Sequence, residues 1–458
     1  MLTWTDEQYE AIHFSGSDIL ISAAAGSGKT TVLVERIIQN IVGGRYSVDE
    51  LLVSTFTNMS AKDMKEKIEK ALRKKYIETG DGRLNEEILK LNEAHISTLH
   101  SFCLYLIKMH YNVIGISPDM RTLSDIEGQI RLESAIDQVL ENYYEESSEA
   151  FVELNLMTAS DKNNSGLKDI IKSMYFTAVA SPKPHEYLTS QFNQYENNEH
   201  MQNILDDYND IIRHKLIALE ASLESLHKDY LTVEHEDLKD IHKRDAFDAL
   251  EDMIRTVAFA REDNLSQRAI SLPPYQLKDG RTSFFKKIAD PDAKKELTDT
   301  QNKVKASYSD LLALHAYTYE EVESELSPMN EMNNILVQIA IDVLALFKEK
   351  KQSRNDMDFS DYEHYALAIL NANDNEVAKI YQDQFKEIMI DEYQDINRVQ
   401  EAIITLIKTG EEQDGNLFMV GDVKQSIYKF RQADPSLFIE KSNRFATPGS
   451  GKVIHLNH

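Results

Sequence analysis

The residues with the clearest chemical potential form a glycine-rich turn near the start of the chain, 23–31. This turn follows a short apolar run and leads into a helical pattern, the strand–loop–helix context that a phosphate-binding loop needs. Gly26 and Gly28 let backbone N–H groups turn inward around a phosphate, and the helix start adds a positive dipole end. Lys29 could reach the outer phosphates, and the Thr30 hydroxyl is placed to bind Mg²⁺. The predicted nucleotide-binding residues of the turn are Ala23, Ala24, Ala25, Gly26, Ser27, Gly28, Lys29, Thr30 and Thr31.

The usual template for such a loop has glycine where this chain has Ala23. The alternative interpretation is a Gly/Ala turn that binds nothing. The flanking strand and helix patterns favour the nucleotide site.

A second group of candidate residues is the acidic pair Asp391–Glu392, at the end of the apolar run Ile388–Ile390. Asp391 would hold Mg²⁺, and Glu392 would orient and deprotonate an attacking water. A second carboxylate beside the metal ligand favours hydrolysis over simple nucleotide holding. The alternative is a charged strand-to-loop turn, which the presence of Lys29 in a phosphate loop makes the weaker interpretation.

A third candidate segment, Gly421–Asp434, also begins where an apolar run ends. Gln425 is suited to sensing a γ-phosphate or its attacking water. Tyr428 and Phe430 alternate with cations, among them Arg431, a pattern suited to stacking on bases beside a neutralised backbone. The alternative is a core Tyr/Phe pair with solvated cations.

The composition indicates a cytoplasmic protein of two or three domains. The chain has 458 residues, 42% of them apolar, with a net charge of −27 and one cysteine, Cys103, so an internal disulfide is excluded. No apolar run approaches the ~20 residues that a membrane span needs. The acidity lies mainly between 113 and 421, since 1–112 holds 13 Lys and Arg against 15 Asp and Glu, and 422–458 holds six against three. This distribution is typical of a solvated acidic surface and leaves a DNA groove built from the two ends possible.

The elements that must position these residues alternate strand and helix at both ends of the chain. Strands are predicted at six apolar runs: 19–21, 51–56, 95–99, 387–391, 416–422 and 452–456. Helical spacing dominates from 113 to 345, which we interpret as an inserted helical domain. Ser360–Glu363 could form a capping box that opens a helix. The predicted fold class is therefore α/β, a parallel sheet interrupted by a large helical insertion.

Together these segments resemble the superfamily 1A DNA helicases, the UvrD/RecB-like group. Thr5–Gln8 resembles the Q motif of that group, which implies that Gln8 reads adenine. Thr55–Ala61 and Ile96–Phe102 resemble motifs Ia and Ib, while 391–395 and 421–434 resemble motifs II and III. The resemblance implies Lys29, Glu392 and Gln425 as catalytic residues. It implies single-stranded DNA contacts at Phe56, Thr57, Asn58, Thr98, His100, Tyr428, Phe430 and Arg431.

The resemblance also implies a domain plan. The RecA-like P-loop NTPase sheet, domain 1A, would comprise 1–112 and 346–446, with the α-helical domain 1B inserted at 113–345. Residues 447–458 would open a truncated domain 2A. ATP and Mg²⁺ are the implied cofactors.

Within this group the chain is most similar to the AddA-type subunits of bacterial AddAB helicase–nucleases. That similarity implies an ATP-dependent helicase that processes DNA double-strand ends for recombinational repair and that pairs with an AddB-type nuclease subunit. It implies a single strand in the groove and a duplex end as substrate. The second lobe and the nuclease domain would lie beyond His458, so residues 1–458 alone are expected to bind ATP·Mg weakly and hydrolyse almost none.

Two other functions are compatible with parts of this pattern. An ATP-gated module that binds single-stranded DNA without motor activity would need neither Glu392 nor Gln425. A P-loop kinase or GTPase fits poorly, because its acidic partner usually lies much closer to the loop than Asp391 lies to Thr30.

Overall fold

The structure is a computed structural model. It describes residues 4–24, 26–159, 165–193, 198–232, 241–262, 291–312, 319–426, 433–447 and 449–456. The chain divides into two compact units. One comprises 1–148, 155–189 and 338–458, and the other comprises 149–154 and 190–337. These borders differ from 113 and 345, and the predicted domain boundaries stay predictions.

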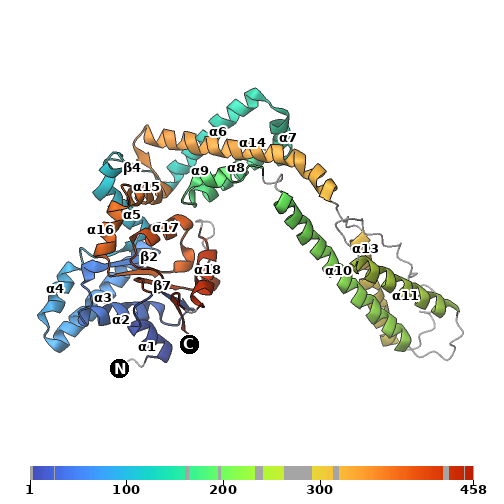
Figure 1. Cartoon of the computed structure of the whole chain (residues 1–458), viewed down its shortest axis with the longest axis horizontal. Helices are drawn as coiled ribbons and strands as arrows, with labels where there is room; N and C mark the ends of the chain where they lie inside the picture. The colour runs from blue at the N-terminus through green and yellow to red at the C-terminus, as the bar shows by residue number, and fades with distance from the viewer. Residues whose placement is uncertain are drawn as a thin grey trace. The chain divides into compact units, whose positions relative to one another are not determined.

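The first unit is built on a six-stranded parallel sheet with the strand order β3-β2-β6-β7-β1-β8. Figure 1 labels β2 and β7 of this sheet. The strands are β1 (Ile19–Ala23), β2 (Leu51–Thr55), β3 (His95–Thr98), β6 (Glu387–Asp391), β7 (Leu417–Gly421) and β8 (Lys452–Leu456). Each lies on one of the six apolar runs. The predicted α/β fold is therefore confirmed, and it has the form of a RecA-like sheet.

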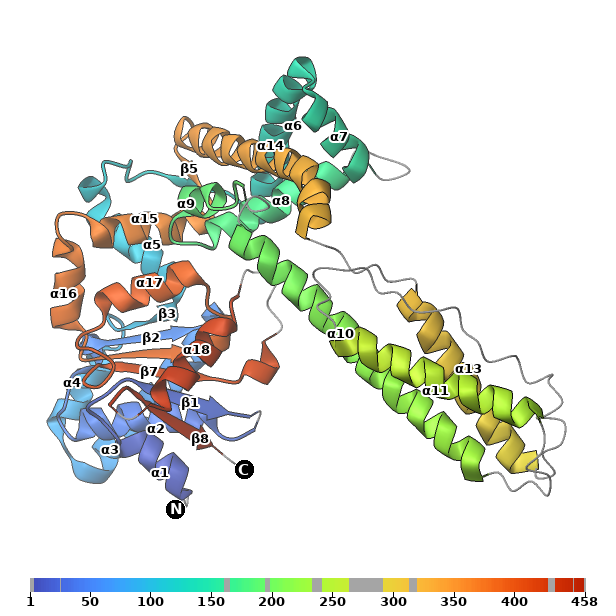
Figure 2. The same ribbon diagram turned by 45° about the vertical axis from the view of Figure 1, so that its right-hand side comes forward.

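Successive residues of each strand point to opposite faces of the sheet, so the sheet contributes to two hydrophobic cores, one on each face. In β7, Phe418 packs on one side and Met419 on the other. One face is covered by α1 (Asp6–His13), α2 (Lys29–Val42), α3 (Asn58–Thr79) and α4 (Gly82–Lys90). The opposite face is covered by α5 (Leu99–His110), α15 (Phe359–Asn371), α16 (Glu376–Gln384), α17 (Arg398–Ile407) and α18 (Ser436–Phe445) (Figure 2). This two-sided burial explains the continuous apolar runs of the strands.

The register brings the carboxyl ends of the strands to one edge, which we call the carboxyl edge. Thr55 pairs with Thr98, and Ser22 pairs with Gly421. Asp391 pairs with Val420, one residue before Gly421. The segments that follow β1, β2, β3, β6 and β7 therefore all leave from this edge.

Two local features differ from the sequence-based expectations. The capping box of α15 is formed by Asp358 and Asp361, whose side chains each accept from the other's backbone N–H, so the prediction at Ser360–Glu363 was wrong by two residues. A two-stranded sheet of β4 (Arg121–Thr122) and β5 (Asp356–Met357) was not predicted, because two residues give no periodic pattern.

The segment predicted to open domain 2A contributes β8, which pairs with β1 at the border of the sheet. Its assignment to a further domain stays a prediction. The remaining helices of the first unit are α6 (Asp125–Glu146), α8 (Ser165–Val179) and α9 (Pro184–Thr189). Two more helices, α7 (Glu149–Thr158) and α14 (Tyr319–Gln352), have residues in both units.

The second unit is helical, as expected for this part of the chain. Its helix α10 (Asn198–Thr232) packs along α11 (Ile241–Glu262) and α13 (Pro291–Leu312) around a core of leucines, Met253, Val257 and Tyr308. Among the helices described in either unit, none combines the length and apolar character needed to cross a membrane.

Candidate nucleotide and DNA site

The turn after β1 has the geometry of a phosphate-binding loop. Gly26 and Gly28 both have φ of +84°, a left-handed conformation that favours glycine. The Ser27 N–H and hydroxyl both donate to the Ala24 carbonyl, at 3.2 and 2.8 Å. Helix α2 begins at Lys29, directly after the turn. Ala25 lies outside the described residues.

Gln8 connects the first helix to this loop. It is the third residue of α1 and forms a reciprocal capping box with Thr5. Its amide Nε2 donates to the Ser27 carbonyl at 3.2 Å. The structure thus brings Gln8 to the loop, and its adenine-reading role stays a prediction.

Lys29, at the start of α2, contacts Glu392, which follows β6 at the carboxyl edge. The Lys29 ammonium lies 3.3 Å from Glu392 Oε2, and the side chains are 11% and 32% exposed. Glu392 has a left-handed backbone (φ +55°), an uncommon conformation for glutamate at the end of a strand. Gln394 Nε2 donates to the same carboxylate oxygen at 2.7 Å. The predicted catalytic pair is therefore assembled, with an amide holding the carboxylate.

The negative charge of the Asp391 carboxylate is not balanced by the positive charges around it. Burial and the neighbouring Glu392 carboxylate raise the pKa of Asp391 to about 6, against the opposing effect of the Lys29 ammonium. A divalent cation would relieve this repulsion, so the donor set fits Mg²⁺. Thr30 is half-buried at the start of α2. Among the described residues, no group of three or more His, Cys, Asp or Glu could hold a metal, so Mg²⁺ would depend on Thr30, Asp391 and the phosphates.

Gln394 also links this pair to the segment after β7. Its Oε1 accepts from the Asp422 N–H at 2.9 Å, and the Asp422 carboxylate accepts from Gln425 Nε2 at 2.6 Å. Gln425 is thus joined to Glu392 through Asp422 and Gln394. Gln394 was not among the site residues predicted from the sequence, although an amide two residues after Glu392 was a visible signal.

The predicted DNA contacts of motifs Ia and Ib are the first residues of two helices. Thr57 is the N-cap of α3 and accepts from the Ser60 N–H at 3.0 Å. Thr98 is the N-cap of α5 and accepts from the Ser101 N–H at 3.2 Å. The Ser101 hydroxyl reaches Asn58 Oδ1 at 3.5 Å, which joins the two helix starts.

These two helix starts suit an anionic backbone, because their orphan N–H groups and dipoles attract phosphate. Thr57 and Asn58 are exposed, Phe56 is half-buried and Thr98 is buried. His100 is the second residue of α5, and its side chain is 42% exposed. Tyr428, Phe430 and Arg431 lie outside the described residues.

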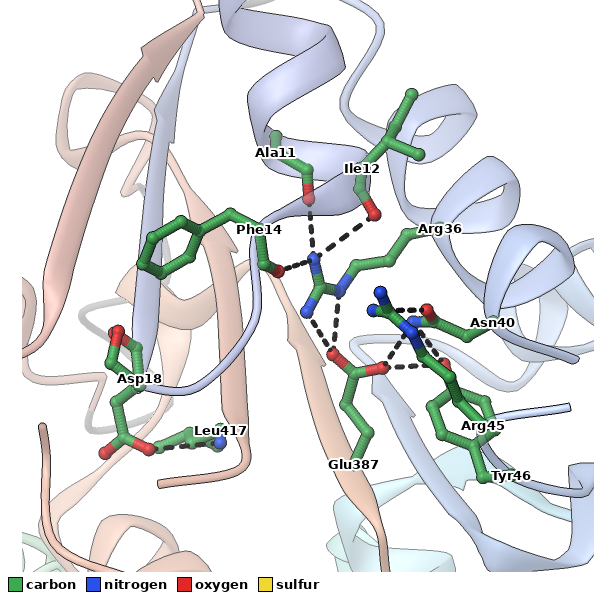
Figure 3. A network of polar contacts seen from close by, with 11 residues as sticks. Ala11, Ile12, Phe14, Asp18, Arg36, Asn40, Arg45, Tyr46, Glu387 and Leu417 are labelled. Carbon is green, nitrogen blue, oxygen red and sulfur yellow. Dashed lines mark hydrogen bonds and ion pairs between the residues drawn. The ribbon is translucent and has the colours of Figure 1, made fainter. Parts of the chain in front are cut away.

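A buried polar network holds the elements behind the nucleotide loop (Figure 3). Arg36 of α2 donates through Nε to Glu387 Oε1 at 2.7 Å, and through Nη1 to the carbonyls of Ala11 and Phe14 at 2.8 and 2.6 Å. The Tyr46 hydroxyl donates to Glu387 Oε2 at 2.6 Å. One guanidinium thereby fixes the end of α1, the helix after the loop and the strand that carries Asp391.

The parallel sheet, the glycine-rich turn after β1 and the acidic pair after β6 define the class of P-loop NTPases. The chain matches the family model described as the UvrD/REP helicase N-terminal domain over residues 4–244 and 225–446. This match covers most of the chain, which therefore belongs to the UvrD/REP helicase family.

Curated relatives give a more specific likeness. The chain is similar to proteins named as subunits of the ATP-dependent helicase/nuclease of Staphylococcus saprophyticus (43% identical), Staphylococcus carnosus (42%) and Staphylococcus aureus USA300 (40%). Each match covers 98% of this chain. The chain spans 37% of the length of these relatives.

Proposed function

We propose that this chain carries the ATP-binding half-site and part of the single-strand groove of an ATP-dependent DNA helicase. The observation that carries the proposal is the contact of Lys29 with Glu392, which unites the phosphate loop and a candidate general base at the carboxyl edge. The family membership and the names of the relatives support the same interpretation.

The chemistry follows from these side chains. Lys29 would bind the β- and γ-phosphates, and a γ-phosphate would compete with Glu392 for its ammonium. Glu392, released but still held by Gln394, would accept a proton from the water that attacks the γ-phosphorus, and ADP would leave. Bound Mg²⁺ would neutralise phosphate charge, with Thr30 and Asp391 as its protein ligands.

DNA would bind along the carboxyl edge beside the nucleotide. The starts of α3 and α5 offer N–H groups to the backbone of a single strand, and Phe56 and His100 offer rings to its bases. From the resemblance to AddA-type proteins, we infer a duplex end as substrate and recombinational repair as the process. The same resemblance points to an AddB-type nuclease partner and to the cytoplasm as the location.

The decisive test is Glu392→Gln in the protein at the full length that its gene encodes. The amide keeps the size and one acceptor of the carboxylate but cannot take a proton. ATP hydrolysis should fall by about 10²–10⁴-fold and unwinding should be lost. The affinity for a fluorescent ATP analogue should stay within about threefold, since Glu392 does not hold the phosphates.

The second candidate, an ATP-gated DNA-binding module without motor activity, makes the opposite prediction. The unmodified protein would then bind ATP and DNA but show no turnover, and Glu392→Gln would change nothing measurable.

A further inference from the structure

Glu363 is a buried carboxylate that no part of the nucleotide chemistry uses. Its side chain is 4% exposed and lies on α15, between α5 and α17. Three side chains donate to it: His100 Nε2 at 3.1 Å, Asn397 Nδ2 at 2.8 Å and Gln400 Nε2 at 2.5 Å. Burial alone would raise the pKa of Glu363, but these three hydrogen bonds lower it below its ordinary value. The carboxylate therefore stays charged at neutral pH.

An apolar residue would be the simpler solution if this position served packing alone. Its neighbours on α15, Tyr362, Ala366 and Leu367, are all buried and apolar or aromatic. A buried charge is costly even when it is fully hydrogen-bonded, and apolar replacements often stabilise a protein. The charge is better explained by what it orients.

Of the three donors, His100 has a side chain that is 42% exposed, whereas Asn397 is buried. Its ring meets the Phe359 ring edge-on, with centroids 5.7 Å apart and planes at 79°. Phe359 is 46% exposed and lies four residues before Glu363, so both contact His100 from one face of α15. One helix thus anchors the imidazole through Nε2 and supports it with a second exposed ring.

We propose that Glu363 is a positioning residue for DNA binding: it fixes the His100 ring beside Phe359, so that the two rings extend the strand-binding surface that begins at Asn58. Through Asn397, the N-cap of α17, the same carboxylate ties this surface to the segment that follows Asp391 and Glu392. The inference rests on the proposed function, since it presumes that a single strand binds at the carboxyl edge.

The test is a double-mutant cycle on the protein at the length that its gene encodes, read as the dissociation constant for fluorescein-labelled dT16. His100→Ala and Glu363→Leu should each weaken dT16 binding by about fivefold or more, the size expected for one lost base stack. The double variant should be no weaker than His100→Ala, because Glu363 acts through the imidazole. Glu363→Gln should largely retain dT16 binding, since its amide oxygen can still accept from the His100 Nε2–H.

The matched control is Asp18→Leu, which removes another buried carboxylate, the partner of Lys408, just before β1 at the amino edge of the sheet, whereas His100 follows β3 at the carboxyl edge. It should destabilise the protein and leave dT16 binding unchanged. If Glu363→Leu does not fold, His100→Phe replaces it, since this variant keeps the ring but loses the anchor and should still weaken binding.

Two results would overturn the positioning role: losses that multiply in the double variant, or normal dT16 binding by Glu363→Leu (by His100→Phe, if Glu363→Leu does not fold). Failure of the unmodified protein to bind dT16 would instead contradict the proposed function itself.

Discussion

Arg36 and Glu387 form an ion pair at 2.7 Å although 351 residues separate them in the sequence. They are 3% and 6% exposed. Arg36 follows the phosphate loop, and Glu387 opens the strand that ends in Asp391. This ion pair therefore joins the two parts of the nucleotide site, which are encoded at opposite ends of the chain.

Breaking this pair should be costly. Glu387→Gln removes the charge but keeps the shape, and leaves the buried guanidinium without its counter-ion. We expect the free energy of unfolding, measured by urea denaturation, to fall by about 3–5 kcal/mol. Glu66→Gln in the exposed pair with Lys70 is the control and should change it by less than about 1 kcal/mol. Equal effects of the two variants would contradict the structural role.

Gly421→Ala should slow ATP hydrolysis, although Gly421 is not among the predicted nucleotide-binding or metal-binding residues. A Cβ at this position would lie 2.4 Å from Gln394 Oε1, so the amide that holds Glu392 must move. Misplacing a catalytic group by about 1 Å can cost roughly 100-fold in rate, and we expect a loss of that order in kcat for ATP hydrolysis. Gly82→Ala on α4, where a Cβ meets nothing, is the control and should leave kcat unchanged. A normal kcat for Gly421→Ala would show that Gln394 does not position Glu392.

Thr57 and Thr98 should contribute to stability as helix caps whether or not DNA is present. Removing either N-cap hydroxyl, as Thr57→Ala or Thr98→Ala, should lower the free energy of unfolding by about 1 kcal/mol. The serine variants keep the capping oxygen and should recover most of the loss. If the serine variants also recover DNA affinity, the helix starts rather than the threonine methyl groups bind the strand.

The stability of the first unit should carry a pH-dependent contribution from Asp361. Burial and the Asp358 carboxylate raise the pKa of Asp361 to about 6, although the Lys351 ammonium opposes them. Because the folded pKa exceeds the unfolded value near 3.9, this contribution is fully present below about pH 4 and is lost as the pH rises through 6. The unfolding free energy of the unmodified protein, relative to Asp361→Asn, should therefore fall by at most about 3 kcal/mol between pH 4 and 7.

Asp356→Asn is the control for that measurement. Burial alone would raise the pKa of Asp356, but Arg131 and Arg121 lower it below its ordinary value. Its contribution is present above the unfolded pKa and is lost only as the pH falls below it. Its difference from the unmodified protein should be flat between pH 5 and 7, and a slope like that of Asp361→Asn would contradict the assignment.

The strands could be predicted from the sequence because strands buried on both faces have continuous apolar runs, as in Leu51–Val53 and Ile388–Ile390. The polar residues follow directly after the carboxyl ends of these runs in the sequence. Lys29, Asp391 and Glu392 could therefore be assigned to the carboxyl edge of the sheet. The Lys29–Glu392 contact confirms that these two side chains meet there.

The residues that orient the site could not be found in this way. Arg36 and Glu363 act through partners far away in the sequence, and no local period or spacing marks such a pair. The capping box of α15 was misplaced because an aspartate, Asp358, takes the role that the pattern gives to serine. Long-range side-chain bonds and the choice between neighbouring caps depend on the packed fold.

The strand order has an electrostatic consequence for two ligands that are both polyanions. From β1, which carries the nucleotide loop, to β3, which precedes His100, the sheet takes four steps. At about 4.8 Å a step, this separates the nucleotide loop from the start of α5 by roughly 19 Å. The Debye length at physiological ionic strength is about 8 Å, so most of the repulsion between a phosphate in the loop and a DNA phosphate at the start of α5 is screened by salt. These two anions can be held at once at little electrostatic cost, and communication between them has to pass through the strands and side chains that lie between.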